Sequence, residues 1–234
     1  MSTSRDQRGV AAGSGTETEY LTHNKVRLAL HHLRPRSAAP HGRTLLLLHG
    51  LGETSPAVPP PWAEPWTGPI AALDFTGHGC STVPAGGGYS AEILLGDADI
   101  ALAAVGEATV VGRGLGAYIA LMLAGARPGQ VHGAVLCDGV GLTGGATGPT
   151  SGSFIRLPPR PAPPDPYALF ELSRDLRPPD YATHFVRLAL DGSGLDDPVA
   201  VAAIMRPKWL AAVVEEVGVV TLPLPAALAS FANP

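Results

Sequence analysis

The stretch TVVGRGLGAYIALMLAG, residues 109–125, constrains the fold of this chain more than any other. Its first residues are apolar in the manner of a buried strand, and the apolar residues after the glycines recur at helical spacing. Between these two parts, Gly112, Gly114 and Gly116 lie within five residues, which predicts a tight turn. A strand, a tight glycine turn and a helix together form the unit from which parallel sheets with covering helices are built.

Similar units recur on both sides of this stretch. Continuous apolar runs that predict strands buried on both faces are RTLLLLHG (43–50), PIAALDFTGHG (69–79) and GAVLCDG (133–139), while VRLALHHL (26–33) alternates. YSAEILLGDADIALAAV (89–105) predicts a helix with Ser90 as its N-cap. Helical spacing continues at 166–190 and 196–217, and 218–224 predicts one last short strand. The predicted fold class is α/β, with a mostly parallel, doubly wound sheet and flanking helices.

Proline and glycine divide the chain. Residues 1–18 are rich in Ser, Gly and Thr and predict a disordered leader, and residues 19–234 predict a single domain. The segment 53–69 carries six prolines and has room for only a very short helix. Residues 143–165 are rich first in glycine and then in proline, which predicts an extended surface excursion.

Composition excludes several classes of function. Only 15% of the residues are charged and the net charge is −4, with Lys and Arg scattered, so we expect no nucleic-acid partner. No apolar run approaches the ~20 residues of a membrane span, and no secretion signal is recognisable, so we expect no membrane association. Cys80 and Cys137 form no disulfide framework, which favours the cytoplasm.

Three ordered segments carry a resemblance to the α/β-hydrolase superfamily over residues 20–142. LLLLHGLG (45–52) resembles its strand and HG turn, LDFTGHGCS (73–81) its D-x-x-G-H-G-x-S loop, and VVGRGLGAYIAL (110–121) its nucleophile elbow. The resemblance implies an α/β-hydrolase-like sheet with a reduced, Gly/Pro-rich cap region. It also implies an elbow equivalent at Gly112, Arg113, Gly114, Leu115 and Gly116, and oxyanion-hole-like residues at His49, Gly50, Leu51 and Leu115.

The chemistry of that superfamily is missing from the sequence. Gly114 stands where the serine belongs, and the last histidine is His184, far from the C-terminus. Asp138 matches the place of the acid in some members, but it has no histidine to orient. We therefore predict that the chain has no catalytic residue and that it binds a small apolar or carbonyl ligand or a partner protein. The glycine has two interpretations: it relieves the backbone strain of an elbow that no longer needs a nucleophile, or it leaves a wider pocket onto which the amides of Leu51 and Leu115 point.

Two other interpretations stay open. A divergent hydrolase would take its nucleophile from elsewhere, from Cys80 beside His78 or from an activated water. A dinucleotide-binding protein would use Gly112–Ala117, which matches G-x-G-x-x-G/A, with Asp138 on the ribose. Residues that could line a pocket in any of these cases are Asp74, His78, Cys80 and Asp138.

The histidines have a simpler interpretation than catalysis. His49 and His78 lie in turn motifs, where we expect their rings to hold loops by hydrogen bonds to the backbone. His31 and His32 are adjacent in a predicted strand, so their rings point to opposite faces. The sequence shows no set of metal ligands, and we expect neither a metal nor another cofactor.

Overall fold

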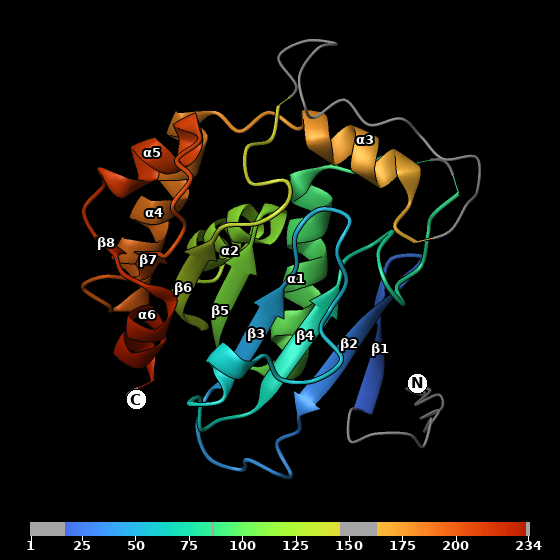
Figure 1. Cartoon of the computed structure of the whole chain (residues 1–234), viewed down its shortest axis with the longest axis horizontal. Helices are drawn as coiled ribbons and strands as arrows, with labels where there is room; N and C mark the ends of the chain where they lie inside the picture. The colour runs from blue at the N-terminus through green and yellow to red at the C-terminus, as the bar shows by residue number, and fades with distance from the viewer. Residues whose placement is uncertain (1–16, 86, 146–162, 233–234) are drawn as a thin grey trace, which may run out of the picture.

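A computed structural model describes residues 17–85, 87–145 and 163–232. Its strands form one eight-stranded sheet in the order β1-β2-β4-β3-β5-β6-β7-β8 (Figure 1). Their bounds are β1 Glu17–His23, β2 Val26–Arg34, β3 Thr44–Leu48, β4 Ile70–Asp74, β5 Ala108–Arg113, β6 Val131–Cys137, β7 Val199–Val201 and β8 Val219–Thr221. β1 and β2 are antiparallel to their neighbours, and the six strands β3 to β8 run parallel to one another. The predicted α/β fold class is confirmed.

Helices cover the two faces of the sheet unequally. The larger apolar core lies between the sheet and α1 (Ala91–Val105), α2 (Leu115–Ala126), α4 (Pro179–Ser193) and α5 (Lys208–Val214). The opposite face has a smaller core, closed by the 3₁₀ helix η1 (Pro61–Ala63) and by α6 (Leu224–Phe231). The remaining helix, α3 (Pro166–Arg174), lies on the side toward which the parallel strands point (Figure 1).

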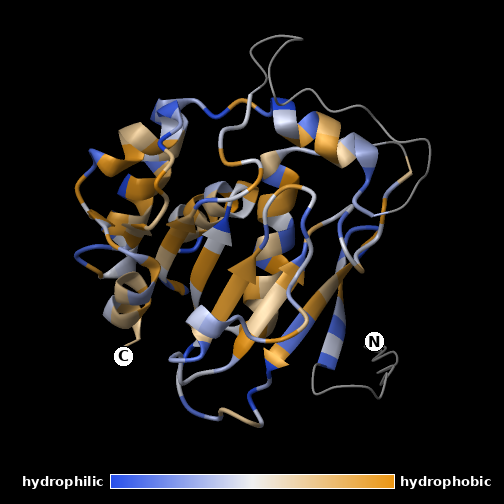
Figure 2. Ribbon diagram, in the orientation of Figure 1, coloured by the Kyte–Doolittle hydropathy of each residue, from blue (hydrophilic) through white to orange (hydrophobic). Residues whose placement is uncertain are grey.

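The apolar runs in the sequence account for this burial. In β3, Leu46 and Leu48 face the larger core and Leu45 and Leu47 face the smaller one, because successive strand side chains alternate. All five residues of β3 and of β4 are buried, and Figure 2 shows these central strands as predominantly hydrophobic. Burial on both faces explains why these strands read as continuous rather than alternating apolar runs.

Most predicted elements are confirmed, among them α1 with its Ser90 cap. The Ser90 side chain accepts a hydrogen bond from the amide of Ile93. The proline-rich segment 53–69 holds only η1, as expected. The predicted helical segment 166–190 is two helices, because Pro178 and Pro179 start a new one.

The structure differs from the sequence predictions at three places. Glu17 and Thr18 belong to β1, where they pair with His32 and His31, so the leader ends before them. The helical spacing at 196–217 conceals the strand β7, whose three residues are short enough to fit a helical pattern. Helix α6 was not predicted at all. Residues 1–16 of the leader and 146–162 of the Gly/Pro-rich segment lie outside the described residues.

Candidate functional site

The turn between β5 and α2 has the backbone conformation that the sequence predicts. Gly114 follows the last residue of β5 and precedes the first residue of α2, with φ 59° and ψ −118°. Residues other than glycine rarely adopt a positive φ of this kind. The prediction that Gly114 lies at positive φ in a strand-to-helix turn is confirmed.

Of the two interpretations of Gly114, the wider pocket is wrong. A Cβ built on Gly114 would lie 2.1 Å from the carbonyl oxygen of Val140 and 2.6 Å from the carbonyl carbon of Gly139. The backbone that follows β6 thus fills the space into which a side chain at position 114 would project. No side chain fits there without displacing that backbone.

The carbonyl oxygen of Val140 also occupies the two amides that the resemblance assigns to an oxyanion hole. The N–H of Leu115 donates to it over 2.9 Å, and the N–H of Leu51 donates to it over 3.0 Å. These distances are those of ordinary N–H···O hydrogen bonds. Both donors are therefore satisfied within the chain, and the protein's own carbonyl lies where an external carbonyl oxygen would have to bind.

The covering loop, which we define as residues 138–142, is anchored at several points. The buried guanidinium of Arg177 donates through Nη1 to the carbonyls of Gly141 and Leu142, over 2.6 and 2.7 Å. The indole of the buried Trp209 donates to the same Leu142 carbonyl over 2.8 Å. These bonds fix the C-terminal end of the covering loop, next to the Val140 carbonyl.

Asp138 anchors the other end of the covering loop. Its carboxylate accepts hydrogen bonds from the amides of Ile204 and Met205, over 2.6 and 3.0 Å. His184 lies elsewhere, exposed on α4 beside Phe185. Within the described part of the chain, no histidine bonds to Asp138. The carboxylate caps a loop and orients no imidazole.

His49 and His78 hold loops, as the sequence analysis expects. The ring of His49 bonds to the carbonyl of Gly50 and accepts from the amide of Phe75. His78 bonds to the carbonyl of Thr76 and accepts from the amide of Gly52. Burial lowers the pKa of both rings, that of His78 to about 4. Both imidazoles are therefore neutral near pH 7 and occupied on both nitrogens.

The four suggested pocket residues do not share one pocket. Asp74 and Cys80 are neighbours, since the amide of Cys80 donates to the Asp74 carboxylate over 2.8 Å. The His78 ring is committed to backbone groups, so it has no nitrogen left to activate a thiol at Cys80. Asp138 is bound to the amides after β7. The pairing of Cys80 with His78 that a divergent hydrolase needs is absent among these contacts.

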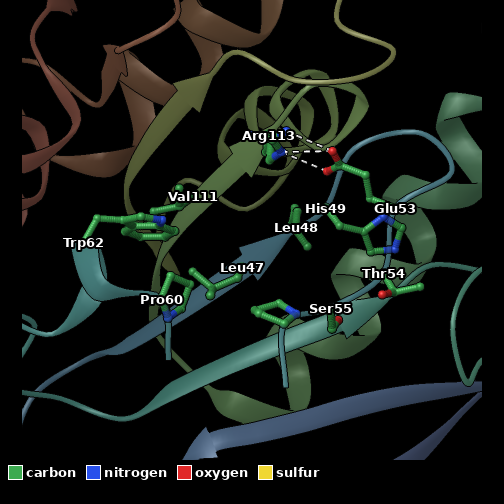
Figure 3. A pocket seen from close by; sticks show the side chains of 11 residues that line it. Leu47, Leu48, His49, Glu53, Thr54, Ser55, Pro60, Trp62, Val111 and Arg113 are labelled. Atoms are coloured by element: carbon green, nitrogen blue, oxygen red, sulfur yellow. Dashed lines mark hydrogen bonds and ion pairs between the residues drawn. The ribbon is translucent and has the colours of Figure 1, made fainter. Parts of the chain in front are cut away.

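A cavity of about 280 Å³ opens instead beside the elbow, on the face of the sheet that carries the smaller core (Figure 3). Its walls come from the carboxyl ends of β3 and β5 and from the proline-rich segment that follows β3. Its lining residues are Leu47, Leu48, His49, Glu53, Thr54, Ser55, Pro56, Pro60, Trp62, Val111 and Arg113. Prolines prevent this segment from forming a full helix, so the sheet face beneath it is incompletely covered.

One ion pair provides the charge in this cavity. The Arg113 guanidinium binds the Glu53 carboxylate through Nε and Nη2, at 2.9–3.1 Å (Figure 3). Burial acts to raise the pKa of Glu53, but the hydrogen bonds from Arg113 and from the amide of Gly50 outweigh it and lower the pKa. Both groups are thus ionised at neutral pH, and the pair has no net charge. The sequence motifs point to Arg113 and His49 but not to the other lining residues, because only the path of the proline-rich segment brings these together.

Comparison with known proteins agrees with this fold. The sequence model of the Alpha/beta hydrolase family matches residues 45–233. A thioesterase domain from the curacin biosynthetic pathway is 16% identical, with a TM-score of 0.60, over 94% of this chain and 98% of that one. A membrane phospholipase A, a bacterial virulence factor, is 18% identical, with a TM-score of 0.50, over 90% and 79%. No curated protein matches the chain.

At these identities the solved structures support the fold alone. None of the described helices is long and apolar enough to cross a membrane. The family match spans most of the sequence, and the order of the strands and the strand–glycine–helix turn agree with it. The chain belongs to the alpha/beta hydrolase family.

Proposed function

We propose that this chain is a noncatalytic member of the alpha/beta hydrolase family that binds a small neutral molecule with an apolar body and a carbonyl group. The observation that carries the proposal is the position of the Val140 carbonyl, which accepts from the amides of both Leu51 and Leu115. Gly114 has no side chain that could attack a substrate carbonyl. The amides of Leu51 and Leu115 are already hydrogen-bonded, so they do not stabilise an oxyanion.

The acid and the histidine of the triad are also missing from their usual places in the sequence. β7 and β8 are followed by Ala202 and by Leu222, which carry no titratable group. The chain after His184 contains no histidine. A divergent hydrolase is the second interpretation. It would need an activated nucleophile, and the His78 ring does not activate the Cys80 thiol. The dinucleotide interpretation is weaker, since the Leu115 amide and the Asp138 carboxylate are both engaged within the chain.

The cavity under the proline-rich segment is the proposed ligand site. Its apolar walls include Leu47, Val111 and the half-buried Trp62, which suit a hydrocarbon body. Nη1 of Arg113 takes no part in the pair with Glu53, so it can donate to a ligand carbonyl. Because Glu53 already neutralises Arg113, a neutral carbonyl is favoured over a carboxylate. The volume of about 280 Å³ is near the lower end of the usual ~300–1,000 Å³ for ligand pockets, so the ligand is small.

Octanamide and octanoate test this preference, because they differ mainly in charge. We expect octanamide to bind the wild-type protein at least about tenfold more tightly, which corresponds to about 1.4 kcal/mol. Titration is followed by calorimetry and by the change in tryptophan fluorescence, which reports on Trp62 because this is the tryptophan that lines the cavity. Glu53→Gln removes the neutralising charge and should reverse the preference toward octanoate.

Two controls bear on the same measurement. Trp62→Ala should abolish binding of both compounds, whereas Trp62→Phe should keep binding and lose the fluorescence change. If both compounds bind equally and Glu53→Gln has no effect, the cavity is not the ligand site.

A partner protein is the other kind of ligand within this proposal. Val140, Ile204 and Met205 are exposed apolar side chains, at 53%, 88% and 57% of their surface. The bonds of Asp138 to the amides of Ile204 and Met205 bring these side chains close to the covering loop. We also propose that the chain from Glu17 onward forms one domain, and that it functions in the cytoplasm, where its two free cysteines would stay reduced.

A further inference from the structure

Three side chains with different ligand atoms meet at the carboxyl end of β4. His31 comes from β2, Asp74 is the last residue of β4, and Cys80 follows in the next loop. One ligand atom from each lies within 4.8 Å of the other two. His31 Nε2 is 2.9 Å from Asp74 Oδ2, and the exposed Cys80 contributes a thiol on the solvent side.

We propose that His31, Asp74 and Cys80 form a binding site for a borderline-soft divalent cation of the zinc type. An imidazole nitrogen, a carboxylate oxygen and a thiolate sulfur are the three kinds of ligand that Zn²⁺ takes in proteins. Three protein ligands leave a fourth tetrahedral position for water, on the side where Cys80 is exposed. This inference is independent of the proposed ligand cavity.

Neighbouring groups already orient two of these ligands. The hydroxyl of Thr18 lies 2.9 Å from Nδ1 of His31, on the side of the ring away from Asp74. The amide of Ser55 donates to the other carboxylate oxygen of Asp74 over 2.7 Å. Metal-binding histidines and carboxylates generally have such supporting hydrogen bonds, which fix the tautomer and the orientation of the ligand.

Binding requires only short movements and a simple proton balance. In the metal-free tautomer that carries its proton on Nε2, His31 donates to Asp74 and its Nδ1 accepts from the Thr18 hydroxyl. With metal bound at Nε2, the imidazole stays neutral by carrying its proton on Nδ1, which then donates to the Thr18 oxygen. The Cys80 thiol loses its proton to solvent as the metal–sulfur bond forms, so one proton is released for each cation. The Cys80 side chain is exposed, and its sulfur already lies within 4.8 Å of the other two ligand atoms.

The sequence alone does not predict this group. Its members stand at positions 31, 74 and 80, without the short ligand spacing of known zinc motifs. Only the pairing of β2 with β4, in which Ala29 lies opposite Asp74, brings them together. The alternation along β2 does predict that His31 and His32 point apart, and His32 indeed contacts Glu19 instead.

Cobalt(II) is the probe, because a thiolate ligand gives it an intense charge-transfer absorption that oxygen and nitrogen ligands do not. We expect titration of the full chain to give this band at one Co²⁺ per chain, and Zn²⁺ to displace it. Cys80→Ser should abolish the band, and His31→Gln should weaken the affinity by about 10- to 100-fold or more. Cys137→Ser is the matched control and should leave the band unchanged, since burial raises the pKa of the Cys137 thiol to about 12.

The outcomes separate the site from incidental binding. Asp74 is left unchanged because it also holds the Ser55 and Cys80 amides, so its replacement would perturb the fold. A chain that shows no thiolate band, or one whose band survives in Cys80→Ser, overturns the proposal. Binding without the band, through surface histidines alone, overturns it as well.

Discussion

Replacing Gly114 by serine is expected to destabilise the fold by about 4 kcal/mol and to create no hydrolase. A side chain at φ 59° and ψ −118° costs about 1–3 kcal/mol in backbone strain. A Cβ 2.1 Å from the Val140 oxygen forces the covering loop to move, and overpacking of this kind costs a further ~1–3 kcal/mol. Urea unfolding followed by circular dichroism measures the sum.

Gly106 provides the matched control for this variant. It lies after α1 with φ 80° and ψ −142°, close to the conformation of Gly114, but a Cβ built there meets no atom within 4 Å. Gly106→Ser should therefore cost only the strain, about 1–3 kcal/mol. Equal losses of stability in the two variants would show that the Val140 carbonyl does not fill the space above Gly114, and a gain of esterase activity in Gly114→Ser would contradict the account more seriously.

Acidification should destabilise the protein through His78. The side chain is fully buried, and burial lowers its pKa from an ordinary 6.5 to about 4, with a further lowering by the nearby His49. Between about pH 6.5 and about pH 4 the unfolded chain takes up a proton at this residue and the folded chain does not. The stability that the neutral ring contributes is thus fully present above pH 6.5 and is lost as the pH falls to about 4. One pKa unit corresponds to about 1.4 kcal/mol, so this loss amounts to about 3 kcal/mol.

The slope of stability against pH, rather than stability itself, identifies this residue. His78→Gln keeps an amide that can donate to and accept from the backbone, but it does not titrate. The variant should be less stable at pH 7 and should depend less steeply on pH between 6.5 and 4. Other groups act in the same range, since burial lowers the pKa of His49 and raises that of Asp97. The comparison between the two proteins removes their contributions, and identical slopes would mean that His78 is solvated or charged in the folded state.

Local patterns in the sequence are sufficient to predict the sheet and the elbow. Apolar runs such as Thr44–Leu48 can be buried on both faces only inside a parallel sheet, and the glycines at 112, 114 and 116 fit only a tight turn. The β7 and α6 elements escape prediction because each is short and depends on the packing of the sheet edge for its stability.

The closure of the site could not be predicted, because it depends on a contact between segments that are distant in sequence. The motifs predict where the amides of Leu51 and Leu115 lie, but nothing in them indicates that Val140 would supply its carbonyl to both. The sequence does not indicate a role for Arg177 and Trp209 either, because they reach the covering loop from distant parts of the chain. A glycine-rich sequence after β6, Asp138 to Gly141, is in retrospect the signal that the chain passes close over the elbow.

Hydrolysis of p-nitrophenyl butyrate by the wild-type protein tests the central claim most directly. We propose that this fold has lost its catalytic side chains and has filled its oxyanion site with the Val140 carbonyl. A triad enzyme without its side chains keeps about 10³–10⁴-fold of its acceleration through the oxyanion hole and binding, and here that residue of activity should be missing too. We predict a rate equal to that of a heat-denatured sample at the same concentration. Turnover well above that level, abolished by Cys80→Ser or by Asp138→Asn, would contradict the account and identify a hydrolase with a relocated nucleophile or base.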